Sequence, residues 1–375
     1  MEKKITIIIP AHNVAGIIQK AINSITCHPQ ATELVEILVV ENGSTDDTVA
    51  VVSELQAQHT NLHLIHSAKG VSCARNRGIE IATGEWLVFL DADDELLPGA
   101  MDVMLDYVRN PEPGDHDRRH TPDICFFGHK NGEELRPVSQ TCVYYASHEV
   151  ADELMATSGH VNGTIQDALI ETLSHPTRYL QVWAKLFRRS LIVDNHIRFD
   201  EKLRLAEDSE FTLRCIAVAQ ALRFCPELTY QYTLNPESVM RTWDGSKVSD
   251  YRHSMEATWE KLNLLNTEPQ GSQLQHEELQ QAYHQYVMTH FNIAMVRETF
   301  HVDNPAGFGE KVAAMKRELA NEADNVFAKS LKAIPWKRCI SPRMIAILLL
   351  RCHCYHLAGL IYHLRAKQNH ARENR

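Results

Sequence analysis

The first hundred residues alternate between short apolar runs and longer amphipathic stretches. The apolar runs of strand length are Ile5–Ile9, Glu36–Val40, Leu62–Ile65 and Trp86–Leu90. The stretches between them with helical spacing are Val14–Ile25, Thr45–Leu55 and Val71–Ala82. We expect Pro10 to end the first strand and Asn13 to cap the first helix. Apolar strands separated by helices predict an α/β fold whose mostly parallel sheet is covered by helices on both faces.

The pattern becomes irregular after residue 94. It predicts helices at Pro98–Val108 and Glu207–Val218. It predicts strands at Ile124–Phe127, Thr141–Tyr145, Leu222–Phe224 and Leu228–Tyr232. From Val248 onward the signals are helical, apart from a polar break at Asn266–Ser272. We therefore expect a catalytic α/β domain at residues 1–245 and a helical region at residues 246–375.

Charge is distributed unevenly along the 375 residues. The formal net charge of −10 argues against a nucleic-acid partner on electrostatic grounds. The segment from Lys329 to Arg375 nevertheless contains ten Lys or Arg residues and one acid, Glu373. Nine cysteines show no disulfide-framework spacing, and the N-terminus lacks the apolar core and cleavage site of a signal peptide. These features predict a cytoplasmic protein with reduced thiols.

Polar clusters follow each of the four predicted strands. They are Pro10-Ala-His-Asn13, Glu41-Asn-Gly-Ser-Thr-Asp46, the segment Lys69–Arg77, and Asp91-Ala-Asp-Asp94. Ligands of open parallel sheets bind at the carboxyl ends of the strands, so these clusters are expected to converge on one rim.

Three carboxylates lie close together in Asp91-Ala-Asp-Asp94. Like charges this close repel one another unless a cation or hydrogen-bond donors compensate them. Mg²⁺ and Mn²⁺ prefer oxygen ligands, and Mg²⁺ commonly binds one or two carboxylates together with substrate phosphates. The cluster therefore predicts a divalent cation beside a phosphorylated substrate. The alternative is that Asp93 or Asp94 caps a helix.

The ordered motifs resemble those of the inverting family-two glycosyltransferases with the GT-A fold, a Rossmann-like architecture. The matching elements are Ile-Pro-x-x-Asn, x-Asn-Gly-Ser-Thr-Asp, Ala-Arg-Asn-x-Gly, Phe-Leu-Asp-x-Asp-Asp and Glu-Asp-x-x-Phe, spread over about residues 4–245. The resemblance implies transfer of a sugar, most simply from a UDP-sugar, to a glycan or glycolipid acceptor. The expected setting is bacterial cell-surface polysaccharide or lipopolysaccharide synthesis.

The resemblance also implies roles for individual residues on the donor side. Asp93 and Asp91 correspond to the D-x-D element that holds Mn²⁺ or Mg²⁺, with Asp91 also near the donor ribose. The donor-binding set implied by the motifs is Pro10, Ala11, Asn13, Glu41, Asn42, Arg75, Asp91, Ala92 and Arg241. Glu41 and Asn42 depart from the family's more frequent aspartates, although an Asn amide offers both a donor and an acceptor to a base. Arg75 either lies near the diphosphate or braces a helix against the sheet.

The acceptor side requires a separate carboxylate. Inverting transfer needs a general base that deprotonates the acceptor hydroxyl as it attacks the anomeric carbon. The Glu-Asp-x-x-Phe match implies Asp208 as this base and Glu207 as its support, although both acids also suit the first turn of a helix. Trp183 either stacks on a sugar or packs in the core. The segment Asn235–Arg241 resembles a loop that closes over the donor, with Arg241 near the diphosphate.

The tail has an interrupted apolar character. Met344–Leu350 and Leu357–Tyr362 are apolar, but Arg351 and two histidines separate them, and a bilayer span takes about 20 apolar residues. With flanking cations, the tail predicts an interfacial helix on the anionic inner leaflet of the membrane. The alternatives are packing on the catalytic domain or a homodimer interface. The competing functions are a sugar-1-phosphate nucleotidyltransferase, which usually has a glycine-rich basic loop after the first strand, and a non-catalytic carbohydrate-binding protein.

Overall fold

The computed structural model describes residues 3–109, 122–158, 161–235, 241–265, 273–320 and 325–373. The chain folds into two compact units. Unit 1 consists of Met1–Ala168, Thr177–Lys202 and Phe211–Thr233. Unit 2 consists of Leu169–Pro176, Leu203–Glu210 and Leu234–Arg375. The boundary at residue 245 between a catalytic domain and a helical region stays a prediction.

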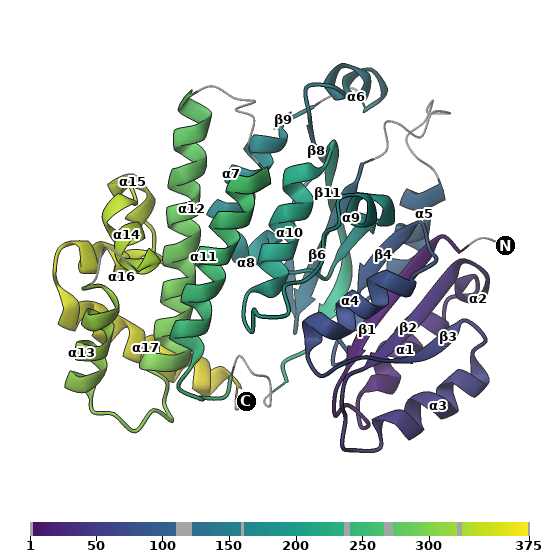
Figure 1. The fold of residues 1–375 in the computed structure, drawn as a ribbon, viewed down its shortest axis with the longest axis horizontal. Helices are drawn as coiled ribbons and strands as arrows, with labels where there is room; N and C mark the ends of the chain where they lie inside the picture. The colour runs from purple at the N-terminus through teal and green to yellow at the C-terminus, as the bar shows by residue number, and fades with distance from the viewer. Residues whose placement is uncertain are drawn as a thin grey trace. The chain divides into compact units, whose positions relative to one another are not determined.

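The first part of the sheet in unit 1 is parallel. Its strands are β1 (Ile5–Ala11), β2 (Val35–Glu41), β3 (Leu62–His66) and β4 (Trp86–Phe89). They lie in the order β3-β2-β1-β4, and each neighbouring pair is parallel (Figure 1). The four strands coincide with the four predicted apolar runs, so the expected α/β class is confirmed.

Beyond β4 the sheet becomes mixed and continues in the order β10-β6-β11-β8-β9. The bounds are β6 (Ile124–Asn131), β8 (Val143–Ala146), β9 (Gly163–Thr164), β10 (Lys185–Arg188) and β11 (Ala221–Tyr232). The short strands β5 (Glu95–Leu96) and β7 (Glu134–Arg136) pair with β11 and β6. The two strands predicted at the end of this region are one strand, β11, whose register shifts between Phe224 and Leu228. Pro226 lies within this shift. Proline has no N–H to donate to a neighbouring strand, so it is tolerated where the regular ladder is interrupted.

Helices cover both faces of the parallel half. The helices of unit 1 are α1 (Ile18–Thr26), α2 (Ala31–Leu34), α3 (Thr48–Gln58), α4 (Val71–Ile81), α5 (Ala100–Arg109), α6 (Ala151–Ser158) and α9 (Arg189–Asp194). The short helix α8 (Pro176–Tyr179) and the helices α7 (Ile165–Ser174) and α10 (Glu207–Val218) cross a boundary between the units. The predicted bounds of α10 are confirmed at both ends.

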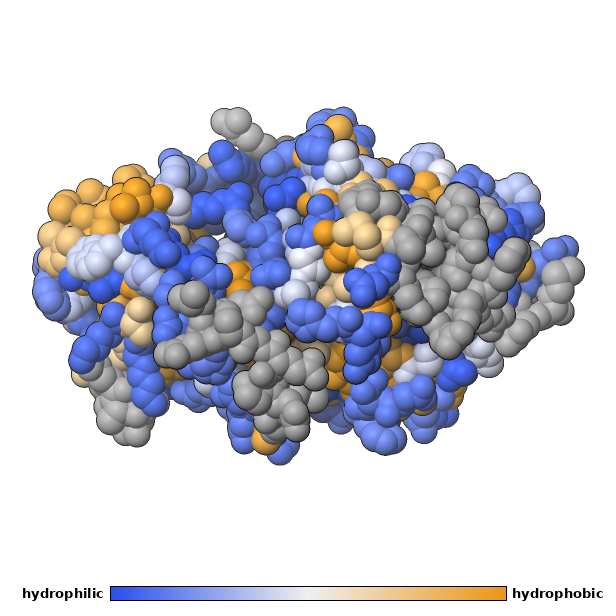
Figure 2. Space-filling view, turned by 90° about the horizontal axis from the view of Figure 1, so that it is seen from above, coloured by the Kyte–Doolittle hydropathy of each residue, from blue (hydrophilic) through white to orange (hydrophobic). Residues whose placement is uncertain are grey.

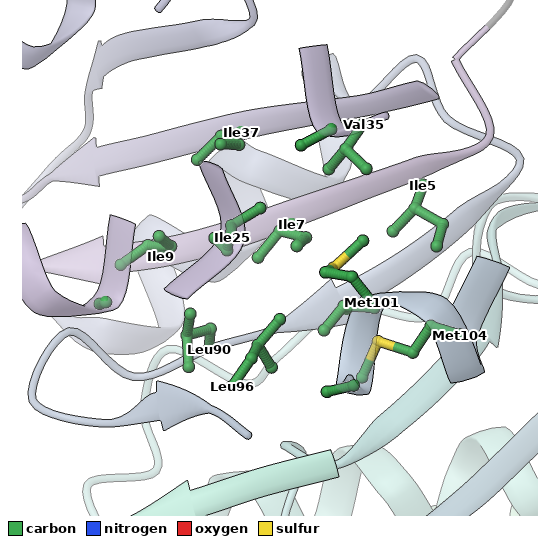
Figure 3. Packing of buried hydrophobic residues seen from close by; sticks show 14 of the residues in the cluster. Ile5, Ile7, Ile9, Ile25, Val35, Ile37, Leu90, Leu96, Met101 and Met104 are labelled. Atoms are coloured by element: carbon green, nitrogen blue, oxygen red, sulfur yellow. The ribbon is translucent and has the colours of Figure 1, made fainter. Parts of the chain in front are cut away.

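The core of unit 1 reflects the period-two alternation of β1. Ile5, Ile7 and Ile9 point to one face, where they meet side chains of α1, α5 and β2 (Figure 3). Ile8 points to the opposite face against α4, where a Cβ at Gly78 would lie 2.5 Å from Ile8 Cγ2. All seven residues of β1 are buried, as expected for a strand covered on both faces.

Two local predictions at the end of β1 are wrong. The strand continues through Pro10 to Ala11. The Ile8 carbonyl accepts a hydrogen bond from the Leu90 N–H, so Pro10, two residues later, turns its nitrogen toward the same side. The pairing of β1 with β4 ends at Ile8 and Phe89, so the proline costs no ladder hydrogen bond there. Asn13 does not cap α1, which begins at Ile18.

Unit 2 is helical in its described residues from residue 247 onward. Its elements are α11 (Lys247–Leu265), α12 (Gln273–Ala294), the π-helix η2 (Met295–Thr299), α13 (Phe308–Glu318), α14 (Val326–Ala333), α15 (Trp336–Cys339), α16 (Ile345–Arg351) and α17 (Tyr355–Glu373). Residues 266–272, predicted as a polar break, lie outside the described residues. In the described part of the chain, we find no helix with the length and apolarity needed to cross a membrane.

The tail contributes to the core of unit 2. Ile347 and Leu350 of α16 are buried, as are Ala358 and Tyr362 of α17. The Tyr362 hydroxyl donates a hydrogen bond to Asn292 Oδ1 at 2.6 Å. One face of α17 therefore packs inside unit 2. Membrane binding and a dimer interface remain open only for its other face.

Candidate donor and catalytic sites

The loops after β1, β2 and β3 leave from the same edge of the sheet, because these strands are parallel. Asn42 joins them: its Nδ2 donates to the Ala11 carbonyl at 2.9 Å, and its Oδ1 accepts from the Gly70 N–H at 3.2 Å. Asn42 is 4% exposed. The expected convergence of these loops is present, and the Asn42 amide contributes to it through backbone contacts.

Asn13 connects the loop after β1 with the loop after β2. Its backbone has a φ of 53°, in the left-handed region where Asn is enriched among residues other than glycine. Its Oδ1 accepts from the Thr45 N–H at 2.7 Å, and its own N–H donates to Ser44 Oγ at 3.1 Å. Pro10 and Ala11 are buried within β1. The side chain that the sequence assigns to a helix cap therefore orders this rim instead.

Glu41 is a nearly buried carboxylate at the end of β2, with a residue exposure of 7%. It accepts hydrogen bonds from the Ser44 N–H and from the His66 Nδ1, the latter at 3.0 Å. Burial by itself would raise the pKa of Glu41, but the hydrogen bonds from Ser44 and His66 outweigh it and lower the pKa. Glu41 is thus held as an ionised acceptor.

Asp91 and Arg75 form an ion pair at the end of β4. Arg75 NH2 lies 3.1 Å from Asp91 Oδ1. The Arg75 side chain is 5% exposed and its guanidinium lies 5.2 Å from the centre of the Phe199 ring, whereas the Asp91 side chain is 29% exposed. Arg75 therefore lies beneath the rim and orients Asp91, while Asp91 reaches the surface. The structure supports the bracing role that the sequence left open for Arg75.

Asp94 differs from its neighbours because it is buried, with 1% exposure. Its carboxylate accepts from the Tyr230 hydroxyl and from the Thr233 N–H, both at 2.6 Å. Burial, followed by the nearby charge of Asp91, raises the pKa of Asp94 to about 8. Tyr230 also accepts from the Asp91 N–H at 3.2 Å. Sequence reasoning missed Tyr230, whose signal was the tyrosine-rich end of a predicted strand.

Trp183 packs against Tyr230 instead of lining an open surface. The two rings stack with centroids 4.5 Å apart and an interplanar angle of 11°. Trp183 is 8% exposed, and the His129 ring meets it edge-on at 4.7 Å. Of the two roles that the sequence allowed for Trp183, the structure favours packing. Tyr230 bonds to the segment Asp91–Asp94 after β4, which we call the acid loop. The packing of Trp183 on Tyr230 therefore helps to hold this loop.

The acid loop has a donor set suited to a divalent cation that also binds phosphate. Asp91 and Asp93 are both partly exposed, and Ala92 between them is buried. Among the residues that the structure describes, no group of three or more His, Cys, Asp or Glu side chains is placed to hold a metal by itself. Mg²⁺ is usually held by one or two carboxylates with substrate phosphates completing the sphere, so Asp91 and Asp93 fit this incomplete type of site.

Glu207 and Asp208 begin α10 and are partly exposed. Ala206 just before them has a φ of 57°, which an alanine rarely adopts and which is typical of functional turns. Asp208 Oδ1 accepts from the Ser209 N–H at 2.8 Å. Tyr251 of α11 is buried near both acids, and burial, followed by their charges, raises its pKa. Both acids belong to unit 2, whereas Asp91 and Asp93 belong to unit 1.

Arg241 also belongs to unit 2. Its Nε lies 3.4 Å from Glu373 Oε1, and its NH1 donates to the Asn235 carbonyl. The same Glu373 oxygen lies 2.7 Å from Arg297 NH1. The loop proposed to close over the donor falls mostly on residues 236–240, outside the described residues.

Comparison with known proteins places this chain among glycosyltransferases. The family model described as Glycosyl transferase family 2 matches residues 6–128. The uncharacterised glycosyltransferase YibD of Escherichia coli is 31% identical over 265 residues, which are 69% of this chain and 71% of YibD. The Staphylococcus aureus poly(ribitol-phosphate) β-N-acetylglucosaminyltransferase TarS is 24% identical over 367 residues, or 97% of this chain. This chain spans 53% of the length of TarS.

Solved structures agree on the fold. Residues 1–349 of S. aureus TarS in complex with UDP-GlcNAc superpose with a TM-score of 0.61 at 16% identity, covering 98% of this chain and 92% of that one. The mannosyltransferase PcManGT of Pyrobaculum calidifontis, in complex with GDP-Man and Mn²⁺, gives a TM-score of 0.51 at 14% identity, with 97% and 88% coverage. At these identities the similarity establishes the architecture alone.

Proposed function

This chain belongs to glycosyl transferase family 2, and on that premise we propose that it transfers a sugar from a UDP-sugar to a saccharide acceptor with inversion. The observation that carries the proposal is the acid loop at the end of β4, with Asp91 oriented by Arg75 and Asp93 beside it. The proposed acceptor is a glycan or glycolipid of cell-envelope polysaccharide or lipopolysaccharide synthesis. The proposed location is the cytoplasm, on the inner face of the membrane.

The rim formed by the loops after β1, β2 and β3 is the proposed nucleoside site. Pro10, Ala11 and Asn13 provide its backbone frame, and Glu41 and Asn42 its carboxylate and amide. Ionised Glu41 suits a ribose hydroxyl or a base N–H as donor. TarS, which has the same fold, was crystallised with UDP-GlcNAc, and this supports a uridine donor. Arg241 is a further proposed contact to the donor.

Asp91 and Asp93 are the proposed ligands of Mn²⁺ or Mg²⁺, with Ala92 forming the close backbone wall of the donor site. Bound there, such a cation neutralises charge on the diphosphate leaving group. Arg75 orients the Asp91 side chain through the 3.1 Å ion pair. Asp94 is held by Tyr230 and is assigned a structural role, because it is only 1% exposed.

Asp208 is the proposed general base, and Glu207 its support. Asp208 takes the proton from the acceptor hydroxyl, whose oxygen attacks the anomeric carbon while the diphosphate departs from the opposite side. The positive φ of Ala206 and the helical first turn of α10 fix the direction of both side chains. Buried Tyr251, whose raised pKa keeps it protonated, adds a neutral neighbour to the two acids.

A donor panel tests this proposal directly. UDP-GlcNAc, UDP-glucose and GDP-mannose are each added with Mn²⁺, and the melting temperature and nucleotide release are measured. A UDP-sugar at about 100 times its dissociation constant is expected to add about 2.7 kcal/mol of stability. Stabilisation by GDP-mannose with no response to either UDP-sugar would overturn the uridine assignment. Absence of nucleotide release with every saccharide acceptor would overturn the transferase proposal.

The tail has a second, outward face. Leu357, Leu360 and Leu364 of α17 are 54%, 46% and 49% exposed and follow helical spacing. Trp336 and Ile340 are 50% and 73% exposed. Figure 2 shows hydrophobic residues gathered at the left of the view, where α14 to α16 lie in Figure 1. Contiguous exposed apolar residues mark interaction surfaces, and the three leucines of α17 form one such row.

Membrane attachment is the occupant proposed for this apolar face. The exposed cations Lys337, Arg343 and Lys367 lie on the same helices or the turns between them. Each basic residue near an anionic leaflet contributes about 1 kcal/mol. In an interfacial helix, cationic side chains lie among the lipid headgroups and apolar side chains enter the acyl region beneath them. The exposed cations and apolar residues of the tail fit this arrangement. Attachment there suits an enzyme that modifies a lipid-linked glycan, whereas a homodimer interface is the competing outcome.

A further inference from the structure

A group of thiols lies on one face of the sheet in unit 1, beneath α5. Cys142 immediately precedes β8, and Cys225 lies within β11. These strands are antiparallel, with Val143 opposite Phe224 and Ala146 opposite Ala221. Continuing this register by one residue places Cys142 directly opposite Cys225.

The hydrogen-bond alternation of the ladder makes this a close pair. The Ser147 N–H donates to the Gln220 carbonyl at 2.8 Å, so that position is hydrogen-bonded. Tyr144 directs its N–H and carbonyl away from β11, to the side chain and backbone of Asn162. Cys142, two residues earlier, therefore faces Cys225 at a non-hydrogen-bonded position, where Cα atoms are about 4.5 Å apart. Disulfides span Cα separations of about 4.4–6.8 Å.

Two polar side chains converge on the same sulfurs. Arg223 NH2 lies 3.4 Å from Cys142 Sγ, and the Tyr107 hydroxyl lies 4.0 Å from it. The Tyr107 hydroxyl donates to Glu227 Oε2 at 3.0 Å and also lies beside the Cys225 thiol. The Tyr107 hydroxyl thus lies beside both thiols, on the face of the sheet to which the register assigns them. The Arg223 guanidinium stabilises negative charge on sulfur during attack on an oxidant.

The two cysteines differ in access. Cys142 is partly exposed, whereas Cys225 is fully buried, and burial raises the pKa of the Cys225 thiol. An oxidant therefore reaches Cys142 first, and Cys225 reacts with the product. Cys125 is also near Cys225, but it is buried on the neighbouring strand β6.

We propose that Cys142 and Cys225 form a reversible cross-strand disulfide when the protein meets a peroxide. The Cys142 thiolate attacks one peroxide oxygen and becomes a sulfenic acid as the O–O bond breaks. The other oxygen leaves as hydroxide, which takes a proton from solvent and becomes water. The Cys225 sulfur then displaces the sulfenic hydroxyl, which leaves as water with the Cys225 proton. The bond fixes the strand that carries Tyr230, the residue that holds the acid loop after β4.

Non-reducing peptide mapping of the full chain after treatment with hydrogen peroxide tests this. The expected product is one Cys142–Cys225 disulfide that dithiothreitol reverses. Closing this long loop should raise the melting temperature by about 3–8 °C relative to the reduced protein. Cys142→Ser should abolish both the bond and the shift, whereas Cys27→Ser, at an exposed cysteine elsewhere, should change neither.

Three outcomes overturn the proposal. The first is a Cys125–Cys225 bond in place of the expected one. The second is oxidation of Cys142 to a sulfinic or sulfonic acid with Cys225 unchanged. The third is an unmodified Cys142 under conditions that oxidise Cys27. Mapping of the wild-type protein decides among these outcomes without any variant.

Discussion

Three carboxylates within four residues, Asp91 to Asp94, have three different surroundings. Asp94 is buried and bonded to Tyr230 and Thr233. Asp91 is paired with Arg75, and Asp93 is partly exposed beside them. Hydrogen bonds and one ion pair thus give a buried acid and two partly exposed acids different surroundings. Because the three side chains are chemically identical, only their surroundings can give them different roles.

Asp93→Asn is expected to abolish cation-dependent transfer and leave the melting temperature within about 1 °C of wild type. The change removes one charged ligand at a partly exposed position, where surface substitutions cost little stability. Transfer is measured over a Mn²⁺ titration and after treatment with EDTA. Asp194→Asn, an exposed acid at the end of α9, is the matched control. Wild-type turnover of the Asp93 variant at limiting Mn²⁺ would refute the assignment.

Asp208→Asn is expected to lower turnover by about 100-fold or more, the scale of general-base catalysis, with UDP affinity nearly unchanged. Calorimetry with UDP and Mn²⁺ measures affinity, and saturating donor isolates turnover. Glu260→Gln, an exposed acid on α11, controls for the loss of one charge in unit 2. If UDP affinity falls while turnover persists, Asp208 is a donor ligand and Glu207 becomes the candidate base.

At the scale of elements, close packing constrains the connection between α4 and β4. A Cβ at Gly84 would lie 2.6 Å from the Thr6 nitrogen and 2.7 Å from the Ile5 carbonyl carbon, both in the backbone of β1. The Gly84 N–H also donates to Thr6 Oγ1 at 2.9 Å. Only glycine allows β4 to enter the sheet at this distance from β1.

Gly84→Ala is therefore expected to destabilise the protein by about 2 kcal/mol or more, since backbone atoms must move to admit the methyl group. Gly16→Ala is the matched control, because a Cβ there meets nothing within 4 Å. Urea unfolding of both variants measures the difference. Equal midpoints for the two variants would contradict the packing argument.

At the scale of the whole molecule, helix α17 of the tail has two different faces. Ala358 and Tyr362 of α17 are buried in unit 2, whereas Leu357, Leu360 and Leu364 are exposed. Removing the tail would therefore expose the core of unit 2. Substitutions on the outer face test membrane attachment without that damage.

The triple variant Leu357→Ser, Leu360→Ser and Leu364→Ser is expected to bind phosphatidylglycerol vesicles at least about 100-fold more weakly than wild type, because three apolar side chains no longer enter the headgroup region. Co-sedimentation at low and high salt measures binding, which salt should weaken. Leu135→Ser, at an exposed leucine of β7, is the control. If wild type ignores the vesicles and only the triple variant loses a dimer, the face is a homodimer interface.

The sequence by itself determined the parallel strands β1 to β4, helix α10 and the order of the polar clusters. β1 to β4 and α10 were predictable because strand and helix periods, together with end signals, are local properties. The positions of Asp91, Asp93 and Asp208 followed from the same local patterns and motifs. The tertiary structure decided what each side chain does there. Asp94 accepts a hydrogen bond from Tyr230, which lies 136 residues later in the chain. The Asn42 amide hydrogen-bonds the backbone of the loops after β1 and β3. Such pairings depend on how the sheet brings distant strands together, and no local period encodes them.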